Sequence, residues 1–290
     1  MSTVLVRRNL QYQVLVSHRT QARLIAEELE ARTGWQIIPE QLTGKGGVNL
    51  LNEMKAMPND GSVFGMVVSE SLGYNLYSSK ADMTPADFTS LTTTAGFQMG
   101  VVSQSSKGWN SMSDVVAAAK AGEEIRFGAM SQRLVDLAYL LGKAQGVEFN
   151  IISVKGGKDV MNGVTAGDMD IGFMAGIQGK GVAAGDLVNL ASALSVPLVQ
   201  TPEAPTFPDL GVPFGADGYF MFAAPAGLSE DARTALTEAI ASIASDPATK
   251  AGGLIQKAFG GATIIKGAEL DALVAKEFED SAALIKAASE

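Results

Sequence analysis

The chain has 290 residues, of which 47% are hydrophobic and 18% are charged, and this composition suits two α/β lobes with substantial cores. Its formal net charge of −9 repels nucleic acid and anionic membrane surfaces, so we expect neither as a partner, although a pocket can still hold a small anion. The chain has no cysteine and one histidine, which excludes disulfides, thiolate nucleophiles and Cys-rich or His-rich metal sites.

The sequence lacks the features of membrane insertion. No run reaches the roughly 18 apolar residues of a membrane span. Residues 1–8 lack the apolar core and small-residue cleavage site of a secretory signal. The chain alone therefore fits either a cytosolic protein or a mature form whose signal has been removed.

The first part of the chain predicts alternating strands and helices. An amphipathic pattern at 22–33 indicates a helix with Thr20 as its N-cap. The predicted elements in chain order are a strand at 13–16, this helix, a strand at 35–38, a helix from the glycine run at 44–47 to about 57, and a strand at 63–68. This alternation predicts a mostly parallel sheet.

The second part repeats the alternation and then becomes helical. The predicted elements are strands at 125–128, 150–154 and 170–174, with helices at 134–143 and 159–166 between them. Residues 229–290 predict helices capped by Ser229 and interrupted by Gly253, Gly260 and Gly261. A long helical tail suggests that the chain returns to the first lobe.

The single histidine, His18, follows the first predicted strand, where ligands bind in open α/β sheets. It can be an ordinary loop residue or a ligand contact, and catalysis is the least favoured role because no second histidine supports it. Four basic residues lie on predicted strand-to-helix loops: Arg19, Lys45, Arg133 and Lys155. Each alone reads as a surface charge, but together they would converge if two lobes face one cleft.

The glycine-rich run at 44–47 precedes a predicted helix, so its amides can face an anion or simply form a tight turn. It lacks the Lys-Ser/Thr pair of a phosphate-binding Walker loop and the third glycine of a dinucleotide fingerprint.

An ordered set of motifs spans nearly the whole chain: Ser17 to Thr20, Gly44 to Gly47, Pro58 to Gly61, Tyr77, Thr84 to Thr89, Lys155-Gly156, Gly167 to Asp170, Ala204 to Phe207 with Gly211, and Phe222 to Gly227. In this order and spacing the chain resembles the substrate-binding proteins of the tripartite tricarboxylate transporters, also called Bug receptors.

The resemblance implies an α/β, two-lobed type II periplasmic binding protein fold with two hinge strands. The first lobe would comprise 1–102 plus 223–290 and the second 103–222, with hinges near Val101-Val102 and Phe220 to Phe222. It implies a periplasmic, monomeric solute-binding protein whose signal peptide has been removed. Such a protein captures a small organic anion, expected to be a carboxylate, for membrane transporter subunits, without a cofactor or chemistry. The alternatives are a ligand presenter for a membrane sensor kinase and an enzyme on the same fold.

The resemblance also implies the ligand-binding residues, although the first loop is shorter and more basic than in the family. The candidates are Ser17, His18, Arg19, Thr20, Gly46, Gly47, Asn49, Ser69, Glu70, Ser131, Arg133, Lys155, Gly156 and Ala175. Amino-acid-binding members have an Asp where this chain has Ala175, which argues against an amino-acid ligand. The two arginines suit a carboxylate, sulfonate or phosphonate.

Overall fold

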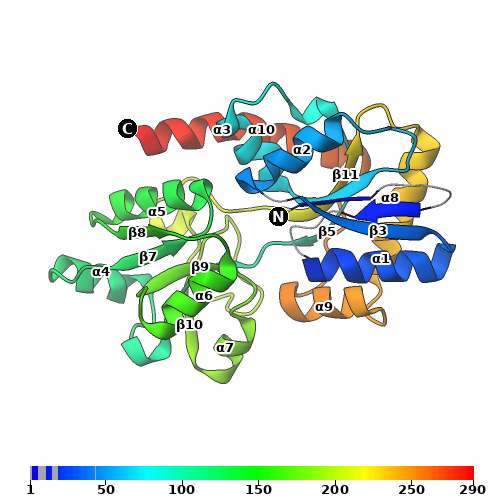
Figure 1. Cartoon of the computed structure of the whole chain (residues 1–290). Helices are drawn as coiled ribbons and strands as arrows, with labels where there is room; N and C mark the ends of the chain where they lie inside the picture. Colours follow the sequence, from blue (N-terminus) through cyan, green and yellow to red (C-terminus); the bar gives the residue numbers. More distant parts are fainter. Residues whose placement is uncertain (1, 6–10, 15–18, 43) are drawn as a thin grey trace. The chain divides into compact units, whose positions relative to one another are not determined.

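The computed structural model describes residues 2–5, 11–14, 19–42 and 44–290. The chain divides into two compact units (Figure 1): unit 1 comprises Met1–Gly96 and Gly218–Ala283, and unit 2 comprises Phe97–Asp217 and Leu284–Glu290. The chain thus changes unit a few residues before each boundary expected from the sequence. Its last residues, expected in the first lobe, group with unit 2.

Unit 1 is built on a six-stranded sheet. Its strands, in sheet order, are β2 (Gln11–Val14), β3 (Gln36–Leu42), β1 (Ser2–Leu5), β4 (Phe64–Val68), β11 (Tyr219–Pro225) and β5 (Phe88–Gly96). Only β2 and β3 pair in parallel among these described strands. The expectation of a mostly parallel sheet is therefore wrong for unit 1. The reason is that β1 and β11 insert antiparallel to their neighbours, and β11 comes from the returning part of the chain.

The helices of unit 1 are α1 (Arg19–Thr33), α2 (Val48–Lys55), α3 (Leu76–Ser79), α8 (Glu230–Ser245), α9 (Lys250–Phe259) and α10 (Gly267–Ser289), whose end extends into unit 2. Ser229 caps α8 as predicted, its Oγ accepting from the amide of Ala232 at 3.3 Å. Thr20 lies inside α1 rather than capping it. Gly253 lies within α9, and Gly260 ends that helix in a left-handed conformation.

At β4 and β11 both faces of the unit 1 sheet are buried, since successive side chains that point to opposite sides are all covered there. On one face Val67 and Met221 join a core with α2 and α10, to which Leu51 and Val274 contribute. On the other face Phe220 meets Phe259 of α9, with ring centroids 4.8 Å apart. Helices α8 and α9 also contact α1. The strand-end loops are thereby fixed to a two-sided core.

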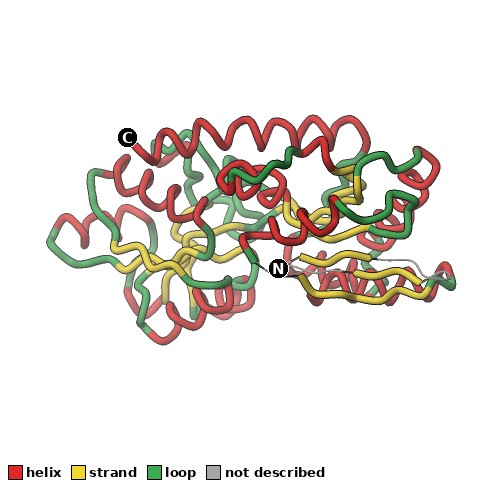
Figure 2. The backbone as a smooth tube through the Cα atoms, turned by 45° about the horizontal axis from the view of Figure 1, so that its top comes forward, coloured by secondary structure: helices red, strands yellow, loops and turns green. Residues whose placement is uncertain are grey.

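Unit 2 is built on a five-stranded sheet with helices on both faces (Figure 2). Its strands, in sheet order, are β10 (Leu187–Ser192), β6 (Met99–Gln104), β9 (Ile171–Ala175), β7 (Arg126–Ala129) and β8 (Asn150–Ser153). Its helices are α4 (Met112–Lys120), α5 (Gln132–Gln145), α6 (Gly157–Ala166) and α7 (Gly179–Ala184). Strands β8, β7 and β9 are parallel, as predicted, whereas β6 pairs antiparallel with both β9 and β10.

A methionine slot fixes α6 to this sheet. A Cβ added at Gly128 of β7 would lie 2.4 Å from Sδ of Met169, and one at Gly163 of α6 would lie 2.9 Å from it. Both distances are too short for a real side chain, so the two glycines make room for a thioether that is only 6% exposed. The residues flanking the slot include Val160 and Val164.

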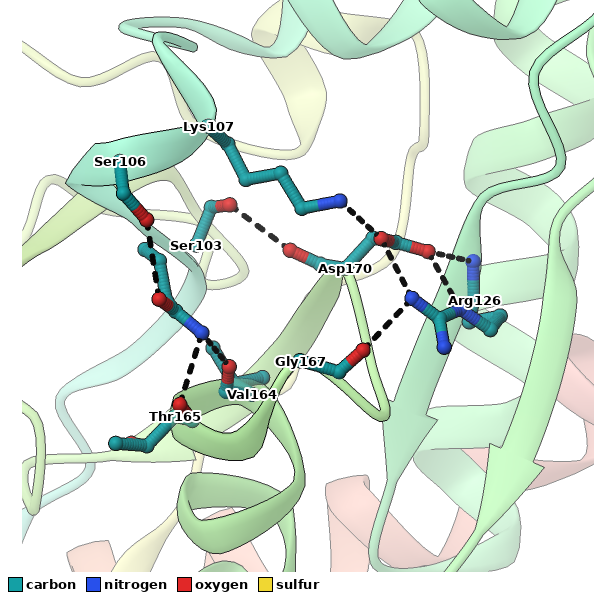
Figure 3. Close-up of polar contacts among 9 residues, drawn as sticks. Ser103, Ser106, Lys107, Arg126, Val164, Thr165, Gly167 and Asp170 are labelled. Atoms are coloured by element: carbon teal, nitrogen blue, oxygen red, sulfur yellow. Dashed lines mark hydrogen bonds and ion pairs between the residues drawn. The ribbon is translucent and has the colours of Figure 1, made fainter.

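A charged cluster joins β7, β9 and the segment after β6 (Figure 3). The side chain of Asp170, 5% exposed, accepts from Nε and NH2 of Arg126 at 2.9 and 3.0 Å and is paired with Lys107. The backbone amide of Arg126 donates to the same carboxylate at 2.9 Å. Burial alone would raise the pKa of Asp170, but these bonds outweigh it and lower the pKa to about 2.

Candidate functional site

The parallel strands of unit 2 bring three of the predicted binding segments to one edge. Strands β8, β7 and β9 end there. The segments after β8 and β7 carry Lys155-Gly156 and Ser131, and Ala175 is the last residue of β9. The amide of Val154 donates to the carbonyl of Ala129 at 2.9 Å, so two of these segments are hydrogen-bonded neighbours. We call this arrangement the unit 2 edge.

Two helix N-termini lie at the unit 2 edge. Ser131 caps α5, its Oγ accepting from the amide of Leu134 at 3.4 Å. Gly156 has an extended conformation (φ −176°) at the start of α6, and the neighbouring Lys155 is exposed. A Cβ added at Gly157 would lie 3.3 Å from Sδ of Met130, which shows how closely the two helix starts approach. Positive helix ends and an ammonium group favour an anion here.

Arg133 is engaged with backbone rather than displayed to solvent. Its NH1 and NH2 donate to the carbonyls of Asp217 and Gly215 at 3.0 and 2.8 Å, and the residue is half-buried. Its guanidinium therefore anchors residues 215–217, immediately before the chain leaves unit 2. This contact was not expected, because strand-end position alone does not tell a ligand donor from a backbone anchor.

The segment after Ala175 is held by side-chain amides that the sequence analysis missed. Gly176 has a φ of +105° and donates its amide to Oε1 of Gln178 at 2.8 Å. Nε2 of Gln178 donates to the carbonyl of Gln98 at 3.1 Å, and Oε1 of Gln98 accepts from the amide of Val199 at 2.9 Å. The only sequence signal is a glutamine two residues after a glycine at a strand end.

In unit 1 the glycine-rich run forms a tight turn. The amide of Gly47 donates to the carbonyl of Gly44 at 3.0 Å, and the two residues between them, Lys45 and Gly46, have φ values of +46° and +61°. A Cβ at Gly44 would lie 2.4 Å from Nδ2 of Asn49, so the predicted binding residue Asn49 lies directly against the turn. Helix α2 begins immediately after the turn, as the sequence predicted.

Two side chains that the sequence analysis did not select hold this turn. The carbonyl of Gly46 accepts from Oγ of Ser71 at 2.8 Å and from Nδ2 of Asn75 at 3.1 Å. Both donors belong to a π-helical turn at Ser71–Asn75, a geometry often found at functional sites. A π turn has no simple sequence signature, so this support was not predictable.

Ser69 and Glu70 follow β4 and are both buried, at 0% and 7% exposure. Oγ of Ser69 donates to Oε1 of Glu277 at 3.1 Å and accepts from the amide of Tyr219 at 3.1 Å. Oε1 of Glu70 accepts from Nδ2 of Asn75 at 3.4 Å. Glu70 and the glycine turn therefore share Asn75 as a support.

Four predicted residues precede or begin α1 in the sequence. Ser17 and His18 lie outside the described residues. Arg19 is the first residue of α1, and Thr20 beside it is exposed. Within the described ranges, the acidic residues form no group suited to a metal ion, and no helix is long and apolar enough to cross a membrane.

A family model described as tripartite tricarboxylate transporter family receptor matches residues 21–289, whereas no functionally curated protein matches the chain.

Three solved structures illustrate the shared fold. A periplasmic transporter is 18% identical over 95% of this chain and 96% of its own, with a TM-score of 0.79. An R. palustris protein solved with adipate is 20% identical over 96% of each chain, with a TM-score of 0.78. MatC from Rhodopseudomonas palustris, solved with malate, is 18% identical over 94% and 98%, with a TM-score of 0.77. The predicted two-lobed periplasmic binding protein fold is thus confirmed.

Proposed function

The chain belongs to the tripartite tricarboxylate transporter receptor family, and we propose that it captures a small dicarboxylic or hydroxycarboxylic acid for such a transporter. The family predicted from the ordered motifs is thereby confirmed, and members of the family are solute-binding receptors. The match over residues 21–289 is the observation on which the proposal depends most.

The chemistry of the unit 2 edge supports a carboxylate as the ligand. The starts of α5 and α6 and the exposed ammonium of Lys155 supply partial and full positive charge. Two of the similar structures were solved with adipate and with malate. Both acids carry two carboxylates, so an acid of this class suits the donors present.

We assign the carboxylate contacts in unit 2 to Oγ of Ser131, Nζ of Lys155 and the backbone amides at the start of α6, beginning at Gly156. A hydrogen bond to a charged group is worth roughly 1.5–3 kcal/mol, so two or three such bonds give useful affinity. Arg133 contributes indirectly by holding residues 215–217. Ala175 completes the edge with a small side chain that leaves space for the ligand.

In unit 1 we assign ligand contacts to the glycine turn and its surroundings. The turn at Gly46-Gly47 is rigidly supported by Ser71 and Asn75, which suits backbone recognition of a polar ligand group. The other unit 1 residues proposed to contact the ligand are Ser17, His18, Arg19, Thr20, Asn49 and Glu70.

The remaining features of the role follow from the family. We propose that the chain performs no chemistry on its ligand, acts in the periplasm as a monomer, and delivers the ligand to membrane transporter subunits. A receptor needs only differential affinity for its ligand-bound state. A secretory signal in the complete gene product and neighbouring genes for membrane subunits would both support this placement.

A thermal-shift screen tests the proposal directly. Adipate, malate and citrate should each be compared with acetate, an alkyl sulfonate, a phosphonate and glutamate. An acid at 100 times its dissociation constant stabilises the folded chain by about 2.7 kcal/mol, which a melting curve detects readily. The expected result is a shift with adipate, malate or citrate and none with glutamate, which is a dicarboxylate with an additional amino group. No shift with any acid, or turnover of one of them, would refute the receptor role.

A matched pair of variants then tests the unit 2 edge. Lys155→Ala removes the proposed charge, whereas Lys143→Ala removes another exposed lysine, from the last turn of α5. Calorimetry should show weaker acid binding in the first variant alone. Equal affinities in both would remove Lys155 from the site.

A further inference from the structure

Each unit contains one buried side chain that joins a predicted ligand loop to the point where the chain changes unit. We define the crossover segments as Gly96–Met99 and Asp217–Tyr219, which contain the two boundaries at 96/97 and 217/218. A hydrogen-bond relay through a buried side chain reaches each of these segments from a loop at the carboxyl end of a strand in the same unit. The second segment also accepts from Arg133, through the carbonyl of Asp217.

The unit 1 relay is centred on Ser69. The hydroxyl proton goes to Oε1 of Glu277 on α10, and the hydroxyl oxygen accepts the amide of Tyr219 at 3.1 Å. Ser69 is fully buried, so its hydroxyl is committed to these two partners rather than exposed to a ligand. The residue predicted to bind ligand instead joins Glu70, its neighbour at the ligand loop, to the second crossover segment.

Helix α10 is pressed closely against the same loop. A Cβ added at Gly73 would lie 3.1 Å from Cβ of Glu277 and 3.3 Å from its carbonyl carbon. This close packing fixes the position of the Glu277 backbone relative to the loop after β4. The carboxylate therefore reaches Ser69 from a rigid support rather than from a mobile helix.

The unit 2 relay is centred on Gln178, which is 2% exposed. Its Oε1 accepts the amide of Gly176 at 2.8 Å, and its Nε2 donates to the carbonyl of Gln98 at 3.1 Å. Gln98 lies in the first crossover segment, and Gly176 follows the predicted ligand residue Ala175. One side-chain amide thus spans from ligand loop to crossover, using one acceptor and one donor.

The crossover end of this relay is itself fixed. A Cβ added at Gly100 would lie 2.7 Å from Oδ1 of Asn189 and 3.4 Å from Nε2 of Gln178. The glycine therefore permits the amide side chains to lie against β6. Both relays use buried polar groups, for which losing a partner is costly.

We propose that Ser69 and Gln178 are positioning residues that make the ligand loop and the crossover segment of each unit move as one body. Ligand that orders Glu70 or Ala175 then restricts the same crossover peptides. The identity of that ligand rests on the proposed function, whereas the relays can be tested in the unliganded chain.

Hydrogen exchange in the full, unliganded chain tests the relays. Ser69→Ala should accelerate exchange of the Tyr219 amide at least about fivefold, because that amide loses its acceptor. Gln178→Met should do the same for the Gly176 amide and also raise exchange of the amides beside Gln98, where β6 begins. The matched controls are Ser71→Ala and Gln200→Met. These side chains also donate a hydrogen bond to backbone, to the carbonyls of Gly46 and Gly179 respectively, but neither bonds a crossover segment.

Two variants at Glu277 separate positioning from general loss of structure. Glu277→Gln keeps an oxygen acceptor for Ser69 and should preserve Tyr219 protection, whereas Glu277→Leu should lose it. These variants also serve if Ser69→Ala does not fold. Unchanged Tyr219 exchange in Glu277→Leu, or equal acceleration in the Ser71→Ala control, would overturn the unit 1 relay. Unchanged exchange near Gln98 in Gln178→Met would overturn the unit 2 relay.

A second arm adds malate and, separately, adipate. Either acid should protect the Tyr219 amide in the unsubstituted chain, and this added protection should be lost in Glu277→Leu although the acid still binds. Retained protection would refute the coupling. If neither acid binds the unsubstituted chain, the proposed ligand class fails, and the unliganded arm still decides the relays.

Discussion

Asp170→Asn is expected to destabilise unit 2 by about 2 kcal/mol at pH 7. The folded pKa of this carboxyl is about 2, compared with about 3.9 in an unfolded chain. A difference of roughly 2 units corresponds to about 2.6 kcal/mol. The partners Lys107 and Arg126 are 36% and 35% exposed, so solvent screening reduces the contribution to about 2 kcal/mol.

The stabilisation by Asp170 should decrease as the pH is lowered. Because the folded pKa is lowered, the stabilisation is complete above the unfolded value near 4 and is lost as the pH falls through 2. The difference between the original chain and Asp170→Asn should therefore fall to about half its pH 7 value by pH 3.

Urea unfolding monitored by tryptophan fluorescence measures this difference. Trp109 lies in unit 2, with its ring centroid 5.2 Å from Nζ of Lys107, and a Trp35→Phe background leaves it as the single reporter. Asp168→Asn is the matched control, because that acid is exposed and two residues away. A pH-independent difference, or an equal loss in the control, would refute the reasoning.

Three other substitutions test the candidate site. Gly46→Ala places a Cβ 2.4 Å from Nδ2 of Asn75. It should lower the free energy of unfolding by about 1–2 kcal/mol more than the control Gly108→Ala, since Gly108 has a similar φ but no atom within 4 Å of the added Cβ. Equal losses in thermal unfolding would contradict this. Lys155→Ala should weaken acid binding roughly tenfold and flatten its salt dependence in calorimetry at two ionic strengths, and an unchanged salt dependence would argue against a charge contact. Arg133→Ala should weaken acid binding at least about tenfold because it releases the carbonyls of Gly215 and Asp217; near-original affinity would show that this anchor is not needed.

Local patterns predicted the elements well where each element has its own signal. The helix after Ser229 begins where its cap predicts, and β7, β8 and β9 lie within about a residue of the predicted strands. Strand direction was harder, because β11 returns from the far end of the chain and pairs antiparallel with β4 and β5. No local pattern specifies such a non-local partner.

The candidate site was predictable in position but not in the use of each side chain. Strand ends correctly brought Ser131 and Lys155 to one edge of unit 2, because parallel strands end together. Ser69 directly follows β4 and Arg133 lies in the first turn of α5, yet their polar groups bond to backbone and to Glu277. These partners lie about 80 or more residues away in the chain, so spacing could not reveal them.

The methionine slot of unit 2 has a consequence for handling the protein. Oxidation of Met169 to the sulfoxide adds an oxygen and a strong dipole where Gly128 and Gly163 leave room only for a thioether. Helix α6 would then have to lift from the sheet, and the Gly156 end of the proposed carboxylate edge would move with it. Ligand affinity should therefore depend on the oxidative history of a preparation. Peptide mass spectrometry of aged samples, compared with their binding activity, would show whether this one thioether accounts for the loss.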